Sequence, residues 1–423
     1  MASAKTIRLW VPPPSRLMPA LTAKGSTRLM VKSRTQVGIV GAGPAGLMLG
    51  HLLHRAGIDS VILESRSREY VVERVRAGVL EQGTVDLMHE ADVGDRLAKE
   101  GMRHEGIYIR FGGARHRIDM AGLTGGRAIT IYGQNEVVKD LIAVRSASAR
   151  PLYFEVTDLS VHDLGTRAPL VRFQHEGVPH EVACDIIAGC DGSHGACRTA
   201  VPPSHLRTYE RDYPFAWLGI LASAPPSSEE LVYSLSERGF ALFSMRSPAI
   251  TRLYLQCAPN EDVNAWSDDR IWSELMARLR TDDEWAPNVG PILQKGVTPM
   301  RSVVVEPMRF GRLFLAGDAA HIVPPTGAKG LNLAMADVRR LAIAIEDFYA
   351  GGGEARLDEY SDRGLRRTWR AQRFSWWMTS MLHRQEGESP FDYRRQQAEL
   401  DYLVSSQAAM TSLAENYVGT PFD

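Results

Sequence analysis

The sequence predicts an α/β protein whose main domain is doubly wound around a parallel sheet, with an inserted antiparallel sheet and C-terminal helices. Three observations predict this class: short β-branched runs alternate with helical patterns in the first half, period-two strands fill the middle, and an Ala- and Leu-rich helical pattern begins at Leu331. We expect the doubly wound domain at 35–206 and 296–345, the antiparallel sheet at 207–295, and a helical interface region at 346–423.

Length and charge limit the kinds of function. The chain has 423 residues, of which 44% are hydrophobic, which suffices for two or three domains with large cores. Its 49 basic and 50 acidic side chains nearly cancel, so we expect a small-molecule ligand and no nucleic acid. No stretch approaches the roughly 18 to 20 consecutive apolar residues that span a bilayer, so no membrane association is expected.

The cysteine pattern argues against metal and disulfide chemistry. Four cysteines, which lie in neither CxxC spacing nor a Cys/His cluster, are Cys184, Cys190, Cys197 and Cys257. We therefore expect no metal site and a reducing, cytoplasmic location.

Residues 1–34 differ in composition from the rest. They contain seven basic residues and no acidic residue. Such a leader resembles an organellar transit peptide, but Met30 offers an internal start just before Thr35, where the first periodic pattern begins. We expect a disordered extension or a misassigned start, dispensable for folding, rather than a targeting signal.

The first chemical signal is a glycine turn. A β-branched strand pattern at 36–40 breaks into Gly-Ala-Gly-Pro-Ala-Gly at 41–46 and passes into a helical pattern. Gly41 permits the tight turn, Gly43 lets the backbone approach a pyrophosphate, and Gly46 allows the helix to pack closely on the strand. The helix N-terminus adds N–H donors for phosphates, so this order predicts a dinucleotide site.

Three later segments extend this pattern. The strand at 60–63 delivers Glu64 about 20 residues after the glycines, where a carboxylate can bind ribose hydroxyls. Segments 185–192 and 312–321 are each a buried strand pattern ending in a glycine turn with an aspartate, Asp191 or Asp318, which suits the ribityl chain of a flavin, although each Asp alone could be a turn or cap residue. The proline- and glycine-rich loop at 323–330 enters a helix, whose N-terminus would stabilise negative charge on a flavin ring.

These segments resemble the three fingerprints of the class A flavoprotein aromatic hydroxylases. Longer stretches narrow the resemblance to members that hydroxylate 4-hydroxybenzoate, namely 74–83, 317–333, 374–380 and 414–419. The resemblance implies FAD as cofactor and NADPH or NADH as electron donor. It also implies O2 as co-substrate and hydroxylation of a small aromatic acid at carbon 3 to give 3,4-dihydroxybenzoate.

Candidate substrate residues lie in three alternating strand patterns between Glu230 and Gln256. Period-two geometry places Ser244 and Arg246 on one face, with Tyr254 on the next strand. A hydroxyl, a guanidinium and a phenol can clamp one aromatic carboxylate, although a polar sheet face with a packed tyrosine is the more ordinary pattern. The resemblance implies that these three residues hold the substrate carboxylate.

The other end of the substrate needs a proton acceptor, because electrophilic hydroxylation is faster on a phenolate than on a phenol. An isolated tyrosine is more often a packing residue. The resemblance nevertheless implies that Tyr233 contacts the phenol oxygen and that its own proton passes through Tyr417 and a path to solvent at His104. It also places Pro325 beside the substrate.

The resemblance assigns further residues to the two nucleotides. For FAD these are Gly41, Gly43, Gly46, Glu64, Arg74, Arg76, Gln134, Asp318, Lys329, Leu331 and Asn332. Arg252 matches a residue that moves the flavin ring between buried and exposed positions. For the nicotinamide nucleotide the candidates are Arg66, Arg68, Arg76 and Arg301. Arg66 and Arg68 could bind the 2′-phosphate of NADPH, or could be solvated arginines at a helix start.

Alternatives remain open at this level. The chain could hydroxylate a related aromatic acid, act as another flavoprotein reductase or oxidase, or bind a dinucleotide without catalysis. A disulfide reductase would need a redox CxxC pair, which the sequence lacks. The aromatic residues of the C-terminal helical segment suit either a homodimer interface or an ordinary core; they are Trp369, Phe374, Trp376 and Trp377.

Overall fold

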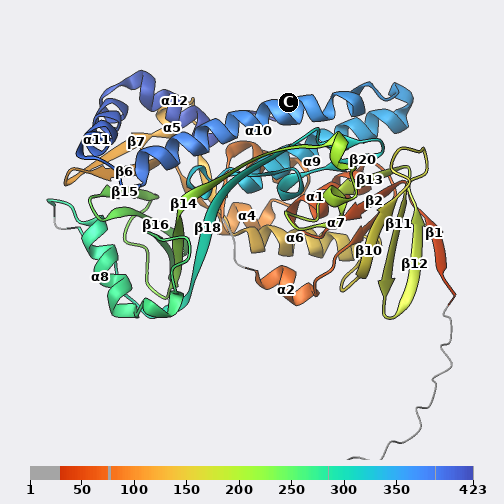
Figure 1. Ribbon diagram of the computed structural model, residues 1–423, viewed down its shortest axis with the longest axis horizontal. Coiled ribbons are helices and arrows are strands. Elements are labelled where there is room, and N and C mark those ends of the chain that lie inside the picture. Colours follow the sequence, from red (N-terminus) through yellow and green to blue (C-terminus); the bar gives the residue numbers. More distant parts are fainter. Residues whose placement is uncertain (1–28, 75–77, 284, 386, 423) are drawn as a thin grey trace, which may run out of the picture.

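The computed structural model describes residues 29–74, 78–283, 285–385 and 387–422. It has the predicted α/β architecture, with parallel and antiparallel sheets at opposite ends of an elongated molecule and the long helix α10 (Ala355–Leu382) running across both (Figure 1). Among the described residues no helix is long and apolar enough to cross a membrane.

The central sheet of the first domain has the strand order β19-β20-β13-β2-β3-β9. All neighbouring strands are parallel except for the β19–β20 pair. The strands are β2 (Val37–Val40), β3 (Ser60–Leu63), β9 (Leu152–Tyr153), β13 (Ile186–Gly189), β19 (Arg309–Phe310) and β20 (Leu313–Leu315). Each of the four central strands is a continuous buried run, as expected for a parallel sheet covered by helices.

Helices cover this sheet and supply most of its packing. Helix α1 packs against both α6 and α9, and α9 packs against α10. The helices of this region are α1 (Pro44–Arg55), α2 (Arg68–Glu73), α3 (Gln82–Glu90), α4 (Asp95–Glu100), α6 (Gln134–Ala147), α7 (Ala196–Thr199) and α9 (Gly330–Asp347). A small sheet joins β4 (Val79–Leu80), β8 (Ile129–Ile131) and β5 (Met102–His104).

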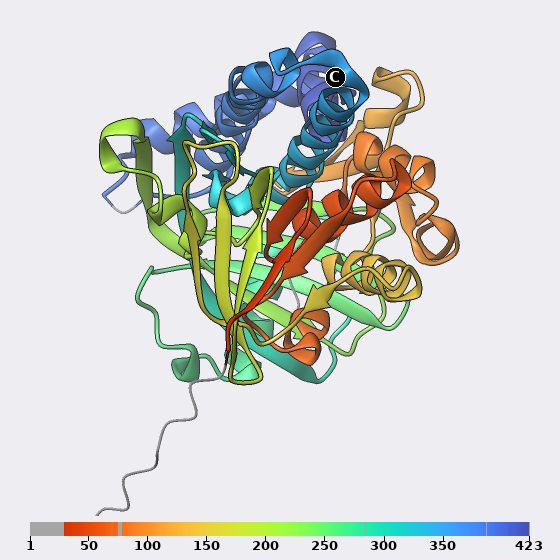
Figure 2. The ribbon, with the colours of Figure 1, turned by 90° about the vertical axis from the view of Figure 1, so that its right-hand side faces the viewer.

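A four-stranded sheet corrects the expected start of the fold. Its order is β1-β12-β11-β10, and its strands are β1 (Val31–Arg34), β10 (Thr157–His162), β11 (Leu170–His175) and β12 (Val178–Ala183). It stands beside the parallel sheet in the end-on view of Figure 2. The prediction that the fold begins at Thr35 was therefore four residues late. Strand β1 forms because it pairs in parallel with β12, although all four of its side chains are exposed.

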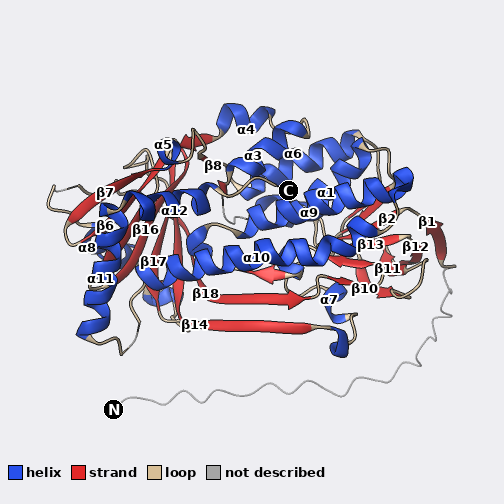
Figure 3. Cartoon of the chain, turned by 90° about the horizontal axis from the view of Figure 1, so that it is seen from above, coloured by secondary structure: helices blue, strands red, loops and turns tan. Residues whose placement is uncertain are grey.

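The antiparallel sheet is larger than predicted. Its order is β21-β18-β14-β17-β16-β15-β6-β7. The strands are β6 (Gly106–Phe111), β7 (Ala114–Asp119), β14 (Arg207–Ala222), β15 (Val232–Ser236), β16 (Gly239–Ser247), β17 (Ile250–Cys257), β18 (Ile292–Glu306) and β21 (His321–Ile322). The expected boundary at residue 296 falls inside β18, because this strand stays paired with β14 along most of its length (Figure 3).

The C-terminal helices close the substrate sheet. They are α10, α11 (Pro390–Ser405) and α12 (Gln407–Val418), while the short α5 (Met120–Leu123) and α8 (Asp268–Leu279) pack elsewhere on the sheet. Two large hydrophobic clusters result, one inside the first domain and one between the antiparallel sheet and α10 to α12. The candidate site lies between these two cores, where β15, the α9 loop and α12 meet.

Candidate active site

The glycine turn joins β2 to α1. Gly41 has a φ of +104°, and a Cβ there would lie 2.3 Å from the carbonyl oxygen of Cys190. A Cβ on Gly46 would lie 1.9 Å from the Gly41 carbonyl oxygen, so the helix packs directly on the turn. At Gly43, the N-cap of α1, no described atom lies within 4 Å of the Cβ position, and no side chain caps the helix. The turn therefore presents N–H donors to open space where a pyrophosphate fits.

Glu64 follows β3 and lies beside this turn. Its Oε2 accepts a hydrogen bond from Ala42 N at 2.8 Å, and its Oε1 accepts one from Arg66 N at 2.8 Å. The carboxylate is thus fixed at the end of the parallel sheet where the ribose of a dinucleotide is expected.

The Gly317-Asp318 turn is brought next to the glycine turn. Gly317 has a φ of +62°, and a Cβ there would lie 3.7 Å from the Cβ of Ala45 in α1. The main-chain N–H of Gly317 donates to Asp337 Oδ2 on α9 at 3.0 Å, which anchors the turn. Asp318 therefore lies at the edge of the predicted dinucleotide site.

The aspartate of the other such segment, Asp191, has a structural role. Asp191 Oδ2 accepts a hydrogen bond from Cys197 N at 2.9 Å, in the first turn of α7. Burial raises the pKa of Asp191. This is the helix-capping role that the sequence left open for each aspartate.

The loop before α9 uses two of the predicted cofactor residues for internal contacts. Lys329 Nζ donates to Glu81 Oε1 at 2.6 Å, and Asn332 Oδ1 accepts from Glu81 N at 2.9 Å. Burial lowers the pKa of Lys329, although Glu81 acts against it. These side chains hold the segment around Glu81, so α9 can offer a flavin its uncapped N-terminal turn, which includes Leu331.

The remaining predicted nucleotide residues lie on the surface or at element ends. The guanidiniums of Arg66 and Arg74 lie 5.3 and 5.5 Å from the ring of Tyr70, on and beside α2. Arg68 is the exposed first residue of α2, and Gln134 is the first residue of α6.

For the last two nucleotide candidates, Arg301 and Arg76, the described residues show no feature that points to a nucleotide. Arg301 is half-buried on β18, opposite Asp212 of β14. Arg76 lies outside the described residues, so its assignment stays a prediction.

Two tyrosines form the centre of the substrate region. Tyr233 on β15 and Tyr417 on α12 are 2% and 1% exposed, and their hydroxyl groups are hydrogen-bonded to each other. The Tyr233 hydroxyl also donates to the carbonyl oxygen of Thr326 at 3.1 Å. Burial raises the pKa of both tyrosines, so both are neutral in this environment.

Strands β16 and β17 bring the predicted carboxylate clamp onto the face that carries Tyr233. Tyr254 and Tyr233 flank Leu242 in one cross-strand row, and Ser244 pairs with Arg252 in the next row. This face is half-buried along β17, where half-buried and buried residues alternate.

The clamp region is electropositive. Arg246 Nη1 donates to the carbonyl oxygen of Met245 at 3.1 Å, and neither its buried Nε nor that of Arg252 has a hydrogen-bond partner among the described residues. No carboxylate of the described residues forms an ion pair with either guanidinium. Burial lowers the pKa of Arg246. Burial alone would raise the pKa of Tyr254, but Arg246 and Arg252 hold it below its usual value. This arrangement favours an anionic ligand.

His104 and Pro325 complete the predicted substrate residues. His104 on β5 is 1% exposed, and neither of its ring nitrogens has a hydrogen-bond partner among the described residues. Burial lowers the pKa of His104 to about 4. Pro325 begins the short helix η4 (Pro325–Gly327), whose Thr326 carbonyl contacts Tyr233.

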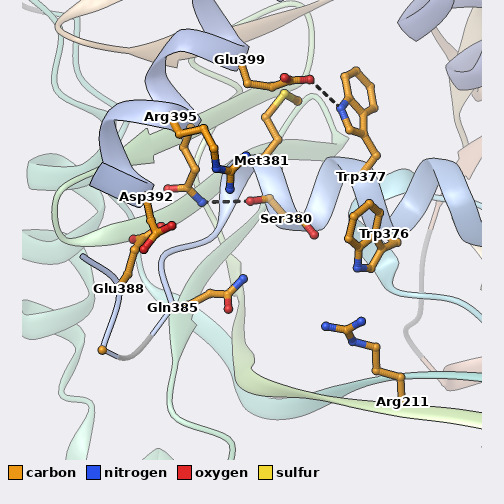
Figure 4. Close-up of a pocket in the computed structure, with 12 residues that line it drawn as sticks. Arg211, Trp376, Trp377, Ser380, Met381, Gln385, Glu388, Asp392, Arg395 and Glu399 are labelled. Atoms are coloured by element: carbon orange, nitrogen blue, oxygen red, sulfur yellow. Dashed lines mark hydrogen bonds between the residues drawn. The ribbon is translucent and has the colours of Figure 1, made fainter. Parts of the chain in front are cut away.

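The C-terminal aromatic residues do not form one surface cluster. Phe374 is 1% exposed and belongs to the core, whereas Trp369 and Trp376 are 41% and 44% exposed. Trp377 donates from Nε1 to Glu399 Oε1 at 2.9 Å. A groove of about 470 Å³ lies here, lined by Trp376 and Trp377 of α10, Arg211 of β14 and charged residues of α11 (Figure 4).

The sequence reasoning missed several residues that position the site. Glu81 is 248 residues from Lys329, and no spacing links the two. Thr379 and His383 of α10 also contact groups at the site through Thr326 and Trp217. A period-four pattern of polar residues on an otherwise apolar helix face was the only available signal for this pair.

Comparisons with known proteins agree with this geometry. The family model described as "FAD binding domain" matches residues 34–375. The chain is 51% identical over 394 residues to p-hydroxybenzoate hydroxylase of Acinetobacter baylyi, covering 93% of this chain and 97% of that protein. It is 25% identical to 3-(3-hydroxy-phenyl)propionate/3-hydroxycinnamic acid hydroxylase of Klebsiella pneumoniae, covering 78% of this chain and 59% of that protein.

Solved structures show the same fold. The p-nitrophenol 4-monooxygenase of Pseudomonas putida superposes with a TM-score of 0.76 at 19% identity, covering 92% of this chain and 99% of that one. The predicted resemblance is confirmed by the family match together with the high identity to a hydroxylase over nearly its whole length. The chain belongs to the FAD-binding-domain family and, within it, to the flavoprotein aromatic hydroxylases.

Proposed function

We propose that this chain hydroxylates 4-hydroxybenzoate at carbon 3 to give 3,4-dihydroxybenzoate, with FAD, NAD(P)H and O2. The observation that carries the proposal is a pair of guanidiniums, Arg246 and Arg252, which have no carboxylate partner among the described residues and lie close to the pair Tyr233 and Tyr417. A ligand with a carboxylate at one end and a phenol at the other matches both features. The relative that is 51% identical is named for this substrate.

FAD fits the residues of the first domain. Open space at the uncapped N-terminus of α1, an anchored ribose acceptor and an uncapped N-terminus of α9 supply the three contacts that such a cofactor needs. Bound FAD would take a hydride from NAD(P)H and activate O2 for electrophilic transfer to the ring. The residues that would hold it are Gly41, Gly43, Gly46, Glu64, Arg74, Arg76, Gln134, Asp318 and the main chain at Leu331 and Asn332.

The substrate would lie along the sheet face with its carboxylate on Ser244, Arg246 and Tyr254. Its phenol would then meet Tyr233. Tyr233 would accept the phenol proton as its own proton passes to Tyr417, whose proton would leave along the path at His104; the phenolate left behind has a more nucleophilic ortho carbon. Arg252, in the row next to Tyr254, would hold or release the flavin ring, and His104 would lie on the proton path to solvent.

The assay that tests this function is NAD(P)H oxidation with and without 4-hydroxybenzoate. We expect the substrate to accelerate oxidation and one 3,4-dihydroxybenzoate to form per NAD(P)H. Equal rates without substrate would indicate an oxidase or reductase. Faster turnover of a differently substituted hydroxybenzoate would indicate a related hydroxylase.

For the electron donor we infer NADPH. The exposed guanidiniums of Arg66 and Arg68 lie next to the ribose acceptor Glu64, where a 2′-phosphate would be attracted. The double variant Arg66→Ala plus Arg68→Ala should lower kcat/KM for NADPH and leave that for NADH unchanged. Arg115→Ala, which removes a surface arginine on β7, is the control. Equal values for both donors in the wild type would contradict the assignment.

We also infer a cytoplasmic homodimer. The exposed Trp376 lines the groove of Figure 4, whose acidic and basic residues can pair across a two-fold axis, and the exposed Trp369 lies two helical turns earlier on α10. Light scattering of the wild type should give twice the mass of one chain. The variant Trp376→Glu should give the mass of a single chain. A monomeric wild type would contradict this inference.

A further inference from the structure

The C-terminal end of α10 carries a row of buried polar residues. Ser375 and Thr379 lie four residues apart on one face of the helix, His383 is its C-cap residue a further four positions on, and all three are fully buried. Neighbouring positions on this part of the helix, such as Phe374 and Met378, are apolar core residues. A buried polar row in such a place needs defined partners.

Thr379 holds the loop that contacts Tyr233. Its hydroxyl donates to the Ser375 carbonyl oxygen at 2.7 Å, which uses its only proton. The Thr379 oxygen must therefore accept from the hydroxyl of Thr326, which lies 2.9 Å away. The carbonyl of that same Thr326 accepts the Tyr233 hydroxyl at 3.1 Å. Thr379 thus fixes both the loop and the acceptor that orients the phenolic proton of Tyr233.

His383 holds the other end of the site. Its Nδ1 lies 2.9 Å from the Thr379 carbonyl oxygen, which can only accept, so Nδ1 carries the proton. Its Nε2 lies 2.7 Å from the indole N–H of Trp217, which can only donate, so Nε2 is the acceptor. Burial lowers the pKa of His383 to about 3, in agreement with this neutral form. The partners therefore specify one tautomer.

Trp217 carries this constraint to the carboxylate clamp. Its ring lies 4.7 Å from the ring of Tyr254, centroid to centroid. On its other side it stacks on Phe240 at 5.1 Å, and His383 stacks on Phe240 at 4.3 Å. The indole can neither tilt nor slide without breaking the hydrogen bond to His383, so Tyr254 packs against a fixed ring.

We propose that Thr379 and His383 are positioning residues that set the two ends of the substrate site separately from one helix: Thr379 orients Tyr233 at the phenol end, and His383 orients Tyr254 at the carboxylate end through Trp217. The inference rests on the proposed function. It adds that α10, which touches no substrate through these residues, fixes the distance between the two ends.

The test compares two readouts in the FAD-loaded full chain. The phenol-end readout is 3,4-dihydroxybenzoate formed per NADPH oxidised. The carboxylate-end readout is the ratio of Kd values for 4-hydroxybenzamide and 4-hydroxybenzoate, measured from the flavin absorbance change on binding. The matched control is Thr368→Val, which removes a fully buried hydroxyl without a hydrogen-bond partner from the same helix.

Thr379→Val should lower product per NADPH about threefold to tenfold, as expected for one lost hydrogen bond, and leave the Kd ratio unchanged. Thr379→Ser, which keeps the hydroxyl, should restore coupling. His383→Phe should lower the Kd ratio about tenfold and leave coupling unchanged, whereas His383→Gln, which keeps an acceptor, should change it less. Trp217→Phe removes the donor and keeps an aromatic ring, and it should reproduce His383→Phe, so it carries the test if that variant does not retain FAD.

Two results would overturn the inference in a wild type that hydroxylates 4-hydroxybenzoate. One is a Thr379→Val variant that matches Thr368→Val in both readouts. The other is a change of both product per NADPH and the Kd ratio in Thr379→Val and again in Trp217→Phe. That result would indicate that each substitution disturbs the packing of the whole site rather than one end of it. A wild type that does not respond to 4-hydroxybenzoate would instead overturn the proposed function, and this inference with it.

Discussion

The hydroxyl of Tyr417 donates to the hydroxyl oxygen of Tyr233, 184 positions away in the sequence. The direction follows from a third partner. Tyr233 must use its own proton on the Thr326 carbonyl, which can only accept, so the proton between the two tyrosines belongs to Tyr417. Without substrate, Tyr233 therefore points its proton at the protein, and it must turn that proton away before it can accept one from a phenol.

This direction predicts uncoupling in Tyr233→Phe. FAD and substrate binding should be largely kept, because the predicted FAD residues and the carboxylate clamp are unchanged. NADPH oxidation should continue with release of hydrogen peroxide, and product per NADPH should fall at least about tenfold, because loss of an acid–base group slows its step by about 10²- to 10⁴-fold. Tyr417→Phe should affect the same step, and the double variant should be far less than additive. Full coupling in Tyr233→Phe would mean that another group activates the phenol.

Arg246→Ala should remove the preference for a carboxylate. We expect the affinity for 4-hydroxybenzoate to weaken by about 2 to 5 kcal/mol, as when one partner of a buried charge pair is lost. The affinity for 4-hydroxybenzamide should change little, because it presents no charge to the missing guanidinium. Isothermal titration of both ligands provides the measurement. A variant that still strongly prefers the carboxylate would show that the clamp lies elsewhere.

Strand β1 predicts different outcomes for two N-terminal truncations. A chain that starts at Met30 keeps β1 and should retain FAD and activity. A chain that starts at Thr35 loses β1 and its ion pairs, Lys32 with Glu181 at 2.9 Å and Arg34 with Asp185 at 2.6 Å. It should melt at a lower temperature, because β12 becomes an open sheet edge. Equal melting temperatures would show that β1 adds no stability.

Buried neutral histidines predict a loss of stability at acid pH. Burial lowers the pKa of His104 to about 4, whereas an unfolded histidine titrates near about 6.5. Below the higher value the unfolded state binds a proton that the folded state does not. The free energy of unfolding should then fall by about 1.4 kcal/mol per pH unit until the folded pKa is reached. Above about pH 6.5 this stability is fully present.

Urea denaturation between these pH values checks the effect. In His104→Gln the free energy of unfolding should fall less steeply with decreasing pH than in the wild type, by the slope given above. Substitution of the exposed His194 by Gln should leave the pH dependence unchanged. An identical decline in wild type and His104→Gln would contradict the prediction.

Local patterns determined how much of the fold could be predicted. Strand β3 was predicted with its observed bounds, because its four residues are apolar or small, buried and flanked by a turn and an acid. The first of the strand patterns predicted from Glu230 onward began two residues before β15 begins at Val232, because Glu230 and Leu231 continue the same run. Strand β1 was missed, because Val31 is its only apolar residue and pairing with a distant strand decides its conformation.

The residues of the candidate site also differ in how far the sequence could predict them. The glycine turn and Glu64 could be predicted from spacing, since both lie within one strand-helix-strand unit. The clamp and the tyrosine pair required the family resemblance, because β15, β16 and α12 meet only in the folded chain. The contact of Lys329 with Glu81 had no sequence signal, and it gave the Lys329 side chain a structural role in place of the expected cofactor contact.

The long pair β14 and β18 has a mechanical consequence. These two antiparallel strands extend from the antiparallel sheet along the FAD-binding domain and are paired over most of their length. They therefore connect the two halves of the molecule by a rigid pair of strands. A rotation of one half against the other would have to bend both strands at once. The pairing shifts register at two places, between Asp212 and Ala216 and between Leu221 and Ala222. Any flexing of one half of the molecule against the other should concentrate at these two interruptions, because paired strands bend most easily where their ladder is irregular.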